Sequence, residues 1–186
     1  TQQTHMKSPL PSETTWKIYE NNSVLWGDML DACKHATSSI DLEQFIFVND
    51  EIGKKFIDIC TEKVKSGVRV RFLFDDAGSF SLLGAFLVSD LSRRGIQIAF
   101  FNTILPRSLD NHRWWFFRNH RRSLIIDSKT AFTGSCCIWA KSVNWDDANV
   151  RINGPVVTKI EKSFEIMWSR AHNVRVPWGT DMQAGD

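Results

Sequence analysis

Strand-type and helix-type segments alternate along this chain, and the alternation limits the folds open to it. Residues 39–48 and 68–74 are rich in branched and aromatic apolar residues, which is typical of β-strands. Between them, apolar positions recur at helical spacing, with Asp50 as the expected cap and Gly67 as the expected terminator. A helix over 82–94 and a strand over 96–101 continue the pattern. This order predicts an α/β fold with a mostly parallel central sheet flanked by helices.

The length of 186 residues suits a single domain. We predict that this domain covers residues 15–171. Residues 1–14 are polar and include two prolines, which indicates a disordered leader, and residues 172–186 are expected to form a C-terminal tail. The apolar runs are shorter than the roughly 18 residues of a transmembrane helix. We therefore expect a cytoplasmic location or a peripheral one at a membrane.

The net charge of +2 gives no general attraction to nucleic acid or membranes, so any basic surface must be local. Residues 107–122 contain five arginines, Arg118 among them, and only one acid. The same segment includes Trp114 and Trp115, followed by two phenylalanines. This composition is compatible with peripheral contact to an anionic membrane or with stacking on nucleic acid bases. The alternative is that the aromatic side chains pack beneath the sheet.

The four cysteines do not follow a metal-binding pattern. Two are adjacent, at Cys136 and Cys137, and none forms a CxxC pair or a cysteine–histidine spacing suited to zinc. We expect buried free thiols, no metal and no cofactor.

The segment with the clearest chemical content begins at His120. Arg122 lies two residues later, Asp127 seven residues later, and Gly134-Ser135 closes the next predicted strand. Alternate residues of a strand share a face, so His120 and Arg122 are expected to point the same way. A nucleophile, a cation and a small-residue turn that meet at one point are what phosphoryl chemistry requires.

This pattern resembles the H-x-K-x4-D-x6-G-S-x-N signature of the phospholipase D superfamily. Here it reads H-x-R-x4-D-x6-G-S-x-C, with Arg122 in the lysine position and Cys137 in the asparagine position. Residues 40–53, 66–79 and 145–155 also resemble bacterial cardiolipin synthase-type domains. The similarity extends over about residues 16–171 and implies a phospholipase D-like fold.

The resemblance implies a role for each matching residue. His120 would attack phosphorus and form a phosphohistidine, Arg122 would bind the phosphate, and Asp127 would have an orienting or structural role. Ser135 would present a hydroxyl near the phosphate, Cys137 would lie beside it, and Asp147 would accept a hydrogen bond from the histidine.

Two further acids lie on or after predicted strands. Glu43 on its strand is a candidate for the site, and pairing with a buried arginine is the alternative. Asp75 follows another strand, where we expect a solvated turn.

The resemblance also implies a second histidine that protonates the leaving group, yet the chain carries one motif. A homodimer that pairs two His120 side chains would supply it, and so would a motif-bearing half outside this chain. The leading substrate is a phospholipid, acted on by a phosphodiesterase or phosphatidyltransferase. The alternatives are a metal-independent nuclease and a catalytically degenerate domain that binds phosphate or supports assembly.

Overall fold

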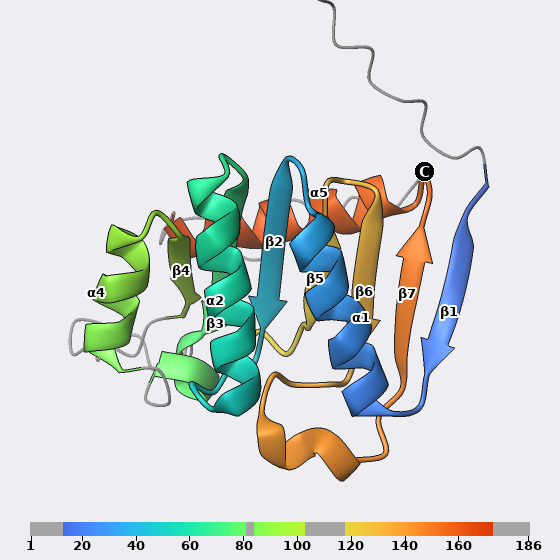
Figure 1. Cartoon of the computed structure of the whole chain (residues 1–186), viewed down its shortest axis with the longest axis horizontal. Helices are drawn as coiled ribbons and strands as arrows, with labels where there is room; N and C mark the ends of the chain where they lie inside the picture. The colour runs from blue at the N-terminus through green and yellow to red at the C-terminus, as the bar shows by residue number, and fades with distance from the viewer. Residues whose placement is uncertain (1–12, 81–83, 103–117, 173–186) are drawn as a thin grey trace, which may run out of the picture.

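A computed structural model of the chain describes residues 13–80, 84–102 and 118–172, and in them seven strands form one sheet (Figure 1). The predicted leader and tail lie almost wholly outside the described residues. The elements in chain order are β1 (Thr15–Tyr19), α1 (Asn22–His35), β2 (Ser39–Gln44), α2 (Glu51–Lys65), β3 (Arg69–Asp75), the π-turn η1 (Asp76–Phe80), α4 (Ala85–Arg93), β4 (Gln97–Phe101), β5 (Ser123–Ile126), β6 (Thr130–Gly134), the 3₁₀ turn η3 (Ala140–Asn144), β7 (Asn149–Asn153) and α5 (Val157–His172).

Local signals account for the ends of the first two helices. The side chain of Asn21 caps α1, because its Oδ1 accepts hydrogen bonds from Ser23 N and Val24 N. Asp50 caps α2 as predicted, because its carboxylate accepts from Ile52 N and Gly53 N, both at 3.1 Å. The chain leaves α2 through Gly67, whose φ of 85° suits glycine.

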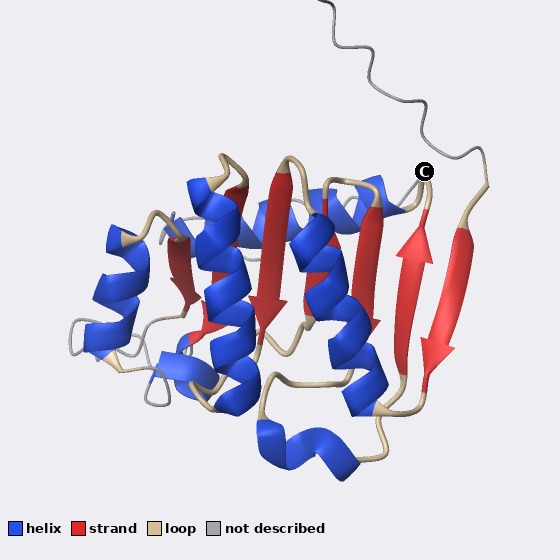
Figure 2. Cartoon of the chain, in the orientation of Figure 1, coloured by secondary structure: helices blue, strands red, loops and turns tan. Residues whose placement is uncertain are grey.

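The helices form two layers around the sheet, as Figure 2 shows. Helices α1, α2 and α4 cover one face, and α5 crosses the other. Leu42 of β2 belongs to the core on the first side, and Leu73 of β3 packs with Phe164 of α5 on the second. The predicted α/β class, with one domain and helices flanking a central sheet, is confirmed.

The strand order is β1-β7-β6-β5-β2-β3-β4. Strands β2, β3 and β4 pair in parallel through helical connections, as predicted. The pairs β2–β5, β5–β6, β6–β7 and β1–β7 are antiparallel. The prediction of a mostly parallel sheet holds for strand direction, since five of the seven described strands run the same way. Among neighbouring strands in the described residues, however, antiparallel pairs outnumber parallel ones. The tight turn between β5 and β6, in which Asp127 and Ser128 have φ near 54° and 55°, makes these two strands antiparallel.

One end of the sheet gathers the segments that carry the motif. The five co-directed strands β1, β2, β3, β4 and β6 end there, toward the bottom of Figure 1. Because β5 and β7 run the opposite way, they begin at this same end. Residues 118–122 before β5, Ser135 after β6 and Asp147 before β7 consequently lie at one edge.

Candidate active site

The segment that carries His120 is not part of β5, which begins three residues later. Two buried carboxylates hold it in place. Asp75, at the end of β3, accepts from Asn119 N at 2.8 Å and from Arg118 Nε at 3.2 Å. Glu43, near the end of β2, accepts from Asn119 Nδ2 at 2.7 Å. Neither carboxylate residue is exposed, so the residue just before His120 is fixed from two parallel strands.

The position of Asp75 differs from the solvated turn expected at this strand end. Its other carboxylate oxygen accepts from Ala77 N and Gly78 N, at 3.0 and 3.2 Å. The carboxylate thus organises η1 and the motif segment together. Its partner Arg118 also donates to the carbonyl oxygens of Phe101 and Asn102. The side chain of Arg118 is 12% exposed and directed into the protein.

Glu43 lies beside the motif segment and close to an arginine. Its carboxylate is 3.5 Å from Arg121 Nε, and Ser123 Oγ donates to it at 3.3 Å. The arginine partner is half-exposed rather than buried, with 36% of its side chain accessible. Burial raises the pKa of Glu43 although these partners and Asn119 oppose the rise.

The imidazole of His120 is exposed and stacks on the ring of Phe45. The ring centroids are 4.0 Å apart and the planes differ by 19°. The guanidinium carbon of Arg122 lies 5.6 Å from the centroid of the same ring. His120 and Arg122 therefore both contact the ring of Phe45, although the strand geometry that predicted their common orientation does not extend to them.

The two departures from the superfamily signature contact each other. Arg122 Nε donates to Cys137 Sγ at 3.1 Å, and Arg122 Nη1 donates to the carbonyl oxygen of His120 at 2.9 Å. Cys137 is buried, as is its neighbour Cys136. Burial, assisted by Asp147, raises the pKa of Cys136 to about 12, so this thiol is neutral at physiological pH.

Ser135 and Asp147 belong to a hydrogen-bond network beside the motif. Ser135 Oγ donates to Asp147 Oδ1 at 2.6 Å, and Asn22 Nδ2 donates to Asp147 Oδ2 at 2.8 Å. Asn149 Nδ2 extends the network to Asn22, and its Oδ1 accepts from Cys136 N at 3.0 Å. Among the described residues, no hydrogen bond joins Asp147 to His120. The acid expected to orient the histidine is instead paired with the serine of the Gly-Ser turn.

Asp127 lies at the opposite end of β5 from His120. Its carboxylate accepts from the main-chain N–H groups of Thr37, Ser38 and Ser39, and from the hydroxyls of Thr37 and Ser38. These contacts join the β5–β6 turn to the segment before β2. Burial favours a higher pKa for Asp127, but hydrogen bonds from these residues outweigh it, and its pKa is lowered. Of the two roles considered for Asp127, the geometry is that of the structural one.

The sequence reasoning missed three residues at this site. Phe45 follows β2, where the alternation of strand residues has stopped, so no periodic signal separated it from core phenylalanines. Asn119 carried no motif, and Asn22 is 125 residues from its partner Asp147 in sequence. Trp114 and Trp115, predicted to contact substrate or membrane, lie outside the described residues.

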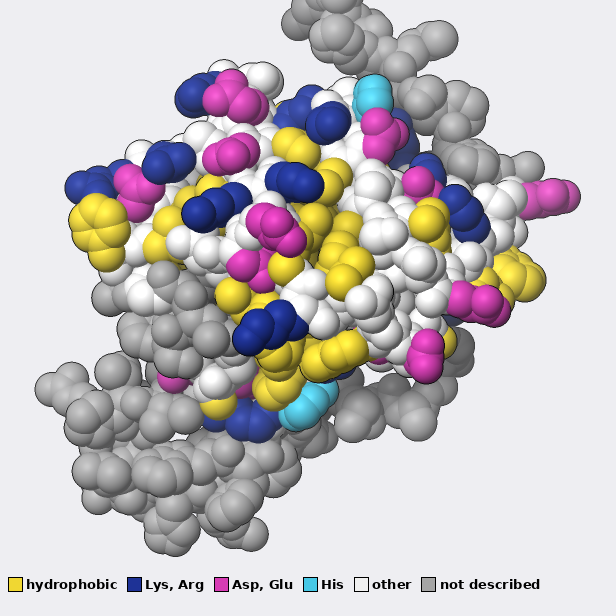
Figure 3. Space-filling view, turned by 60° about the horizontal axis from the view of Figure 1, so that its bottom comes forward, with side chains coloured by type: hydrophobic (Ala, Val, Ile, Leu, Met, Phe, Trp, Pro, Cys, Tyr) yellow, Lys and Arg dark blue, Asp and Glu magenta, His cyan; other side chains and the backbone are white. Residues whose placement is uncertain are grey.

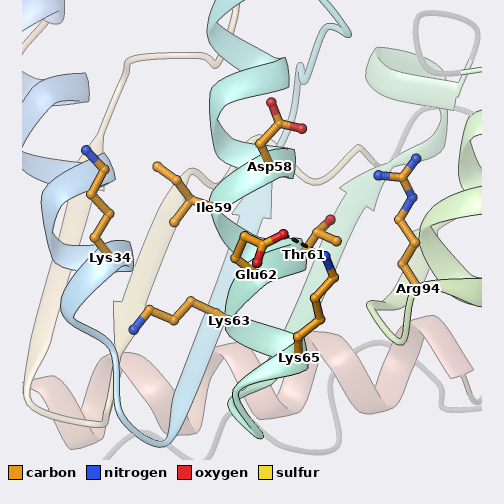
Figure 4. Close-up of a pocket in the computed structure, with 8 residues that line it drawn as sticks. All are labelled: Lys34, Asp58, Ile59, Thr61, Glu62, Lys63, Lys65 and Arg94. Carbon is orange, nitrogen blue, oxygen red and sulfur yellow. Dashed lines mark hydrogen bonds and ion pairs between the residues drawn. The ribbon is translucent and has the colours of Figure 1, made fainter.

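Figure 3 turns this end of the sheet toward the viewer, where hydrophobic side chains lie near basic and histidine side chains. A separate hollow of about 500 Å³ opens on the outer layer of helices (Figure 4). Lys34, Lys63, Lys65 and Arg94 line it, with Asp58 and Glu62. Lys65 pairs with Glu62, Lys63 with a main-chain carbonyl and Arg94 with Asp90, so three of the four cations already have partners. This hollow shares no residue with the His120 site.

No cluster of three or more His, Cys, Asp or Glu side chains in the described part of the chain is arranged to hold a metal ion. Among the described helices, none combines the length and apolar character needed to cross a membrane.

Comparisons with known proteins agree with the resemblance in the sequence. A family model described as "Cardiolipin synthase, PLD-like domain" matches residues 29–168. The probable cardiolipin synthase YwiE of Bacillus subtilis is 31% identical over 84% of this chain, and cardiolipin synthase 1 of Bacillus cereus is 30% identical over 86%. Each alignment covers 32% of the relative, so the chain spans about a third of their length.

Solved structures share the fold at lower identity. Nuc of Salmonella typhimurium, described as a phospholipase D family member, has a TM-score of 0.60 and 17% identity, over 84% of this chain and 95% of that one. NucT of Helicobacter pylori has a TM-score of 0.62 and 12% identity, over 84% and 97%.

Proposed function

The chain belongs to the family of cardiolipin synthase, phospholipase D-like domains, and we propose that it catalyses phosphodiester cleavage or phosphatidyl transfer with His120 as the nucleophile. The observation that carries this proposal is the exposed imidazole of His120, which stacks on Phe45, together with the Arg122 guanidinium, which lies over the same ring and donates to the His120 carbonyl oxygen. An accessible ring nitrogen next to a fixed cation suits attack on a phosphate whose negative charge must be neutralised.

The reaction has two displacements at phosphorus. In the first, the lone pair of a His120 ring nitrogen forms a P–N bond while the P–O bond to the alcohol breaks. A second, protonated imidazole transfers its proton to the departing oxygen. In the second displacement, that imidazole removes a proton from water or an acceptor alcohol. The oxygen attacks phosphorus, and the P–N bond breaks to restore His120.

The remaining residues divide into phosphate contacts and supports. Arg122 would hold the phosphate oxygens, and the Ser135 hydroxyl would contact the phosphate while Asp147 orients it. Cys137 would act through Arg122. Glu43 and Asp75 would keep the His120 segment in place without touching substrate.

The second imidazole requires a second motif. We propose that it comes from another copy of this chain or from another motif-bearing half. Sedimentation velocity separates the alternatives. A dimer with activity supports pairing of two copies, while an inert monomer that gains activity with an added motif-bearing half supports the other.

The proposed substrate class is phospholipid, because the curated relatives at about 30% identity are named cardiolipin synthases. The test is turnover of phosphatidylglycerol vesicles and of a single-stranded DNA oligonucleotide by wild type, His120→Ala and His35→Ala. His35, on the exposed end of α1, is the matched control. We expect lipid turnover that His120→Ala abolishes and His35→Ala preserves. Turnover of DNA alone would indicate a nuclease, and no turnover by any dimeric or reconstituted form would indicate a binding domain.

A further inference from the structure

We propose that Phe45 is a positioning residue that sets the orientation of both the His120 imidazole and the Arg122 guanidinium. The inference rests on the proposed function of His120. Phe45 does not react in this account, and it acts through the two groups that do.

The first observation is the way His120 is held. Stacking at 4.0 Å and 19° restricts rotation of the imidazole, yet it uses only the face of the ring. Among the described residues, no hydrogen bond reaches either ring nitrogen of His120. An acid bonded to the ring would occupy one nitrogen, whereas stacking on an aromatic face occupies neither. A nucleophile needs that combination of restricted orientation and a free lone pair for in-line attack.

The second observation concerns Arg122, whose guanidinium lies over the same ring. Its Nε donates to Cys137 Sγ, and one hydrogen of its Nη1 is donated to the carbonyl oxygen of His120. A guanidinium has five N–H donors in a fixed fork, so three remain for a phosphate. Phe45, Cys137 and the main-chain carbonyl together fix the plane in which these donors point.

The third observation is that Phe45 is itself tightly held. Its carbonyl oxygen accepts from Ser79 Oγ at 2.9 Å, and the same Oγ accepts from Phe47 N at 3.1 Å. A Cβ on Gly78 would lie 2.1 Å from the Phe45 carbonyl oxygen, so only glycine allows η1 to approach this closely. The side chain is only partly buried, while Phe47 two residues later is fully buried. Phe47 is therefore a core residue and a suitable control.

The test compares Phe45→Leu, Phe45→Tyr and the control Phe47→Leu in the full chain. Phe45→Leu keeps an apolar side chain without an aromatic face, and Phe45→Tyr keeps the face. The first measurement is the ¹H–¹³C NMR spectrum of the His120 ring. A stacked phenyl ring moves imidazole proton resonances upfield. We expect this displacement to be lost in Phe45→Leu, retained in Phe45→Tyr and retained in Phe47→Leu.

The second measurement is steady-state kinetics with bis(p-nitrophenyl) phosphate in the form of the protein that is active. We expect kcat to fall by about tenfold to a hundredfold in Phe45→Leu, because misplacement of a reacting group has effects of this order. Phe45→Tyr should restore kcat to within about threefold, whereas a merely structural side chain would not distinguish Tyr from Leu in this way. Equal kcat in Phe45→Leu and wild type would overturn the proposal.

The two measurements separate this inference from the proposed function. If no form of the wild type turns over any diester, the proposed function fails. The NMR comparison then decides whether Phe45 orients His120 at all, and unchanged His120 resonances in Phe45→Leu would refute that. If wild type is active and Phe45→Leu loses both the resonance displacement and kcat, both proposals are supported.

Discussion

Replacing Asp127 by alanine should destabilise the fold, because this carboxylate joins the β5–β6 turn to the start of β2. Five donors from residues 37–39 converge on its two oxygens, at distances between 2.7 and 3.1 Å. A hydrogen bond to a charged group contributes about 1.5–3 kcal/mol when it is protected from water. Thr37 and Ser38 are exposed, so solvent would replace most of their bonds. We therefore expect a loss of about 2–4 kcal/mol in the free energy of unfolding rather than the full sum.

The size of this loss should depend on pH in a defined direction. The folded-state pKa of Asp127 is lower than the unfolded value, since the hydrogen bonds favour the charged form more than burial disfavours it. The contribution of the carboxylate is thus complete above the unfolded pKa of about 3.9. It disappears as the pH falls through the lower folded value, where both states bind the proton.

Urea and thermal unfolding of wild type, Asp127→Ala and Asp127→Asn test this reasoning at about pH 7 and at the lowest pH where wild type still folds. At about pH 7 the alanine variant should melt about 5–15 °C lower, and the asparagine variant should lie between the two. The gap between wild type and Asp127→Ala should narrow in acid. A variant as stable as wild type at neutral pH, or a gap that widens in acid, would refute the account of this carboxylate.

Three further predictions concern the site itself. Because burial raises the pKa of Glu43, the fold disfavours the ionised form of this side chain. Glu43→Gln should therefore gain stability relative to wild type as the pH rises from about 4 to about 7. Urea unfolding that shows the reverse trend would contradict this. Gly78→Ala should lose about 1–3 kcal/mol because its Cβ would meet a carbonyl oxygen at 2.1 Å, whereas Gly27→Ala, with open space around it, should not be destabilised. Because Arg122 contacts Cys137, the effects of Arg122→Lys and Cys137→Asn on kcat/KM should not be additive. A double-mutant cycle should give an interaction energy of about 0.5–3 kcal/mol. Additive effects would show that the two departures are independent.

Sequence patterns were informative wherever the determining interactions are local. Helix α2 follows from the Asp50 cap, the spacing of apolar residues and Gly67, all within one segment. The antiparallel pairing of β5 beside β2 was not predicted, because it depends on which strands meet after the chain returns from residues 102–117.

The candidate site was predicted as a set of residue types but not as an arrangement. The motif predicted that His120, Arg122 and Ser135 lie near one another, and the sheet brings their segments to one edge. The support beneath them comes from residues distant in sequence. In the sequence Asp75 resembles an ordinary turn residue. In the structure it is buried at the end of β3 and accepts a hydrogen bond from the main-chain N–H of Asn119. Phe45 lies just after the last residue of β2, so strand periodicity did not predict where its side chain points.

Trapping the covalent intermediate tests the central claim most directly. The protein in its active form would be mixed with a phosphodiester that it turns over, quenched without acid because phosphohistidine is acid-labile, and analysed by mass spectrometry. The account predicts a phosphoryl adduct on the peptide containing His120 in wild type and in His35→Ala, and none in His120→Ala. Turnover by wild type with the adduct on another residue, or turnover undiminished in His120→Ala, would contradict it.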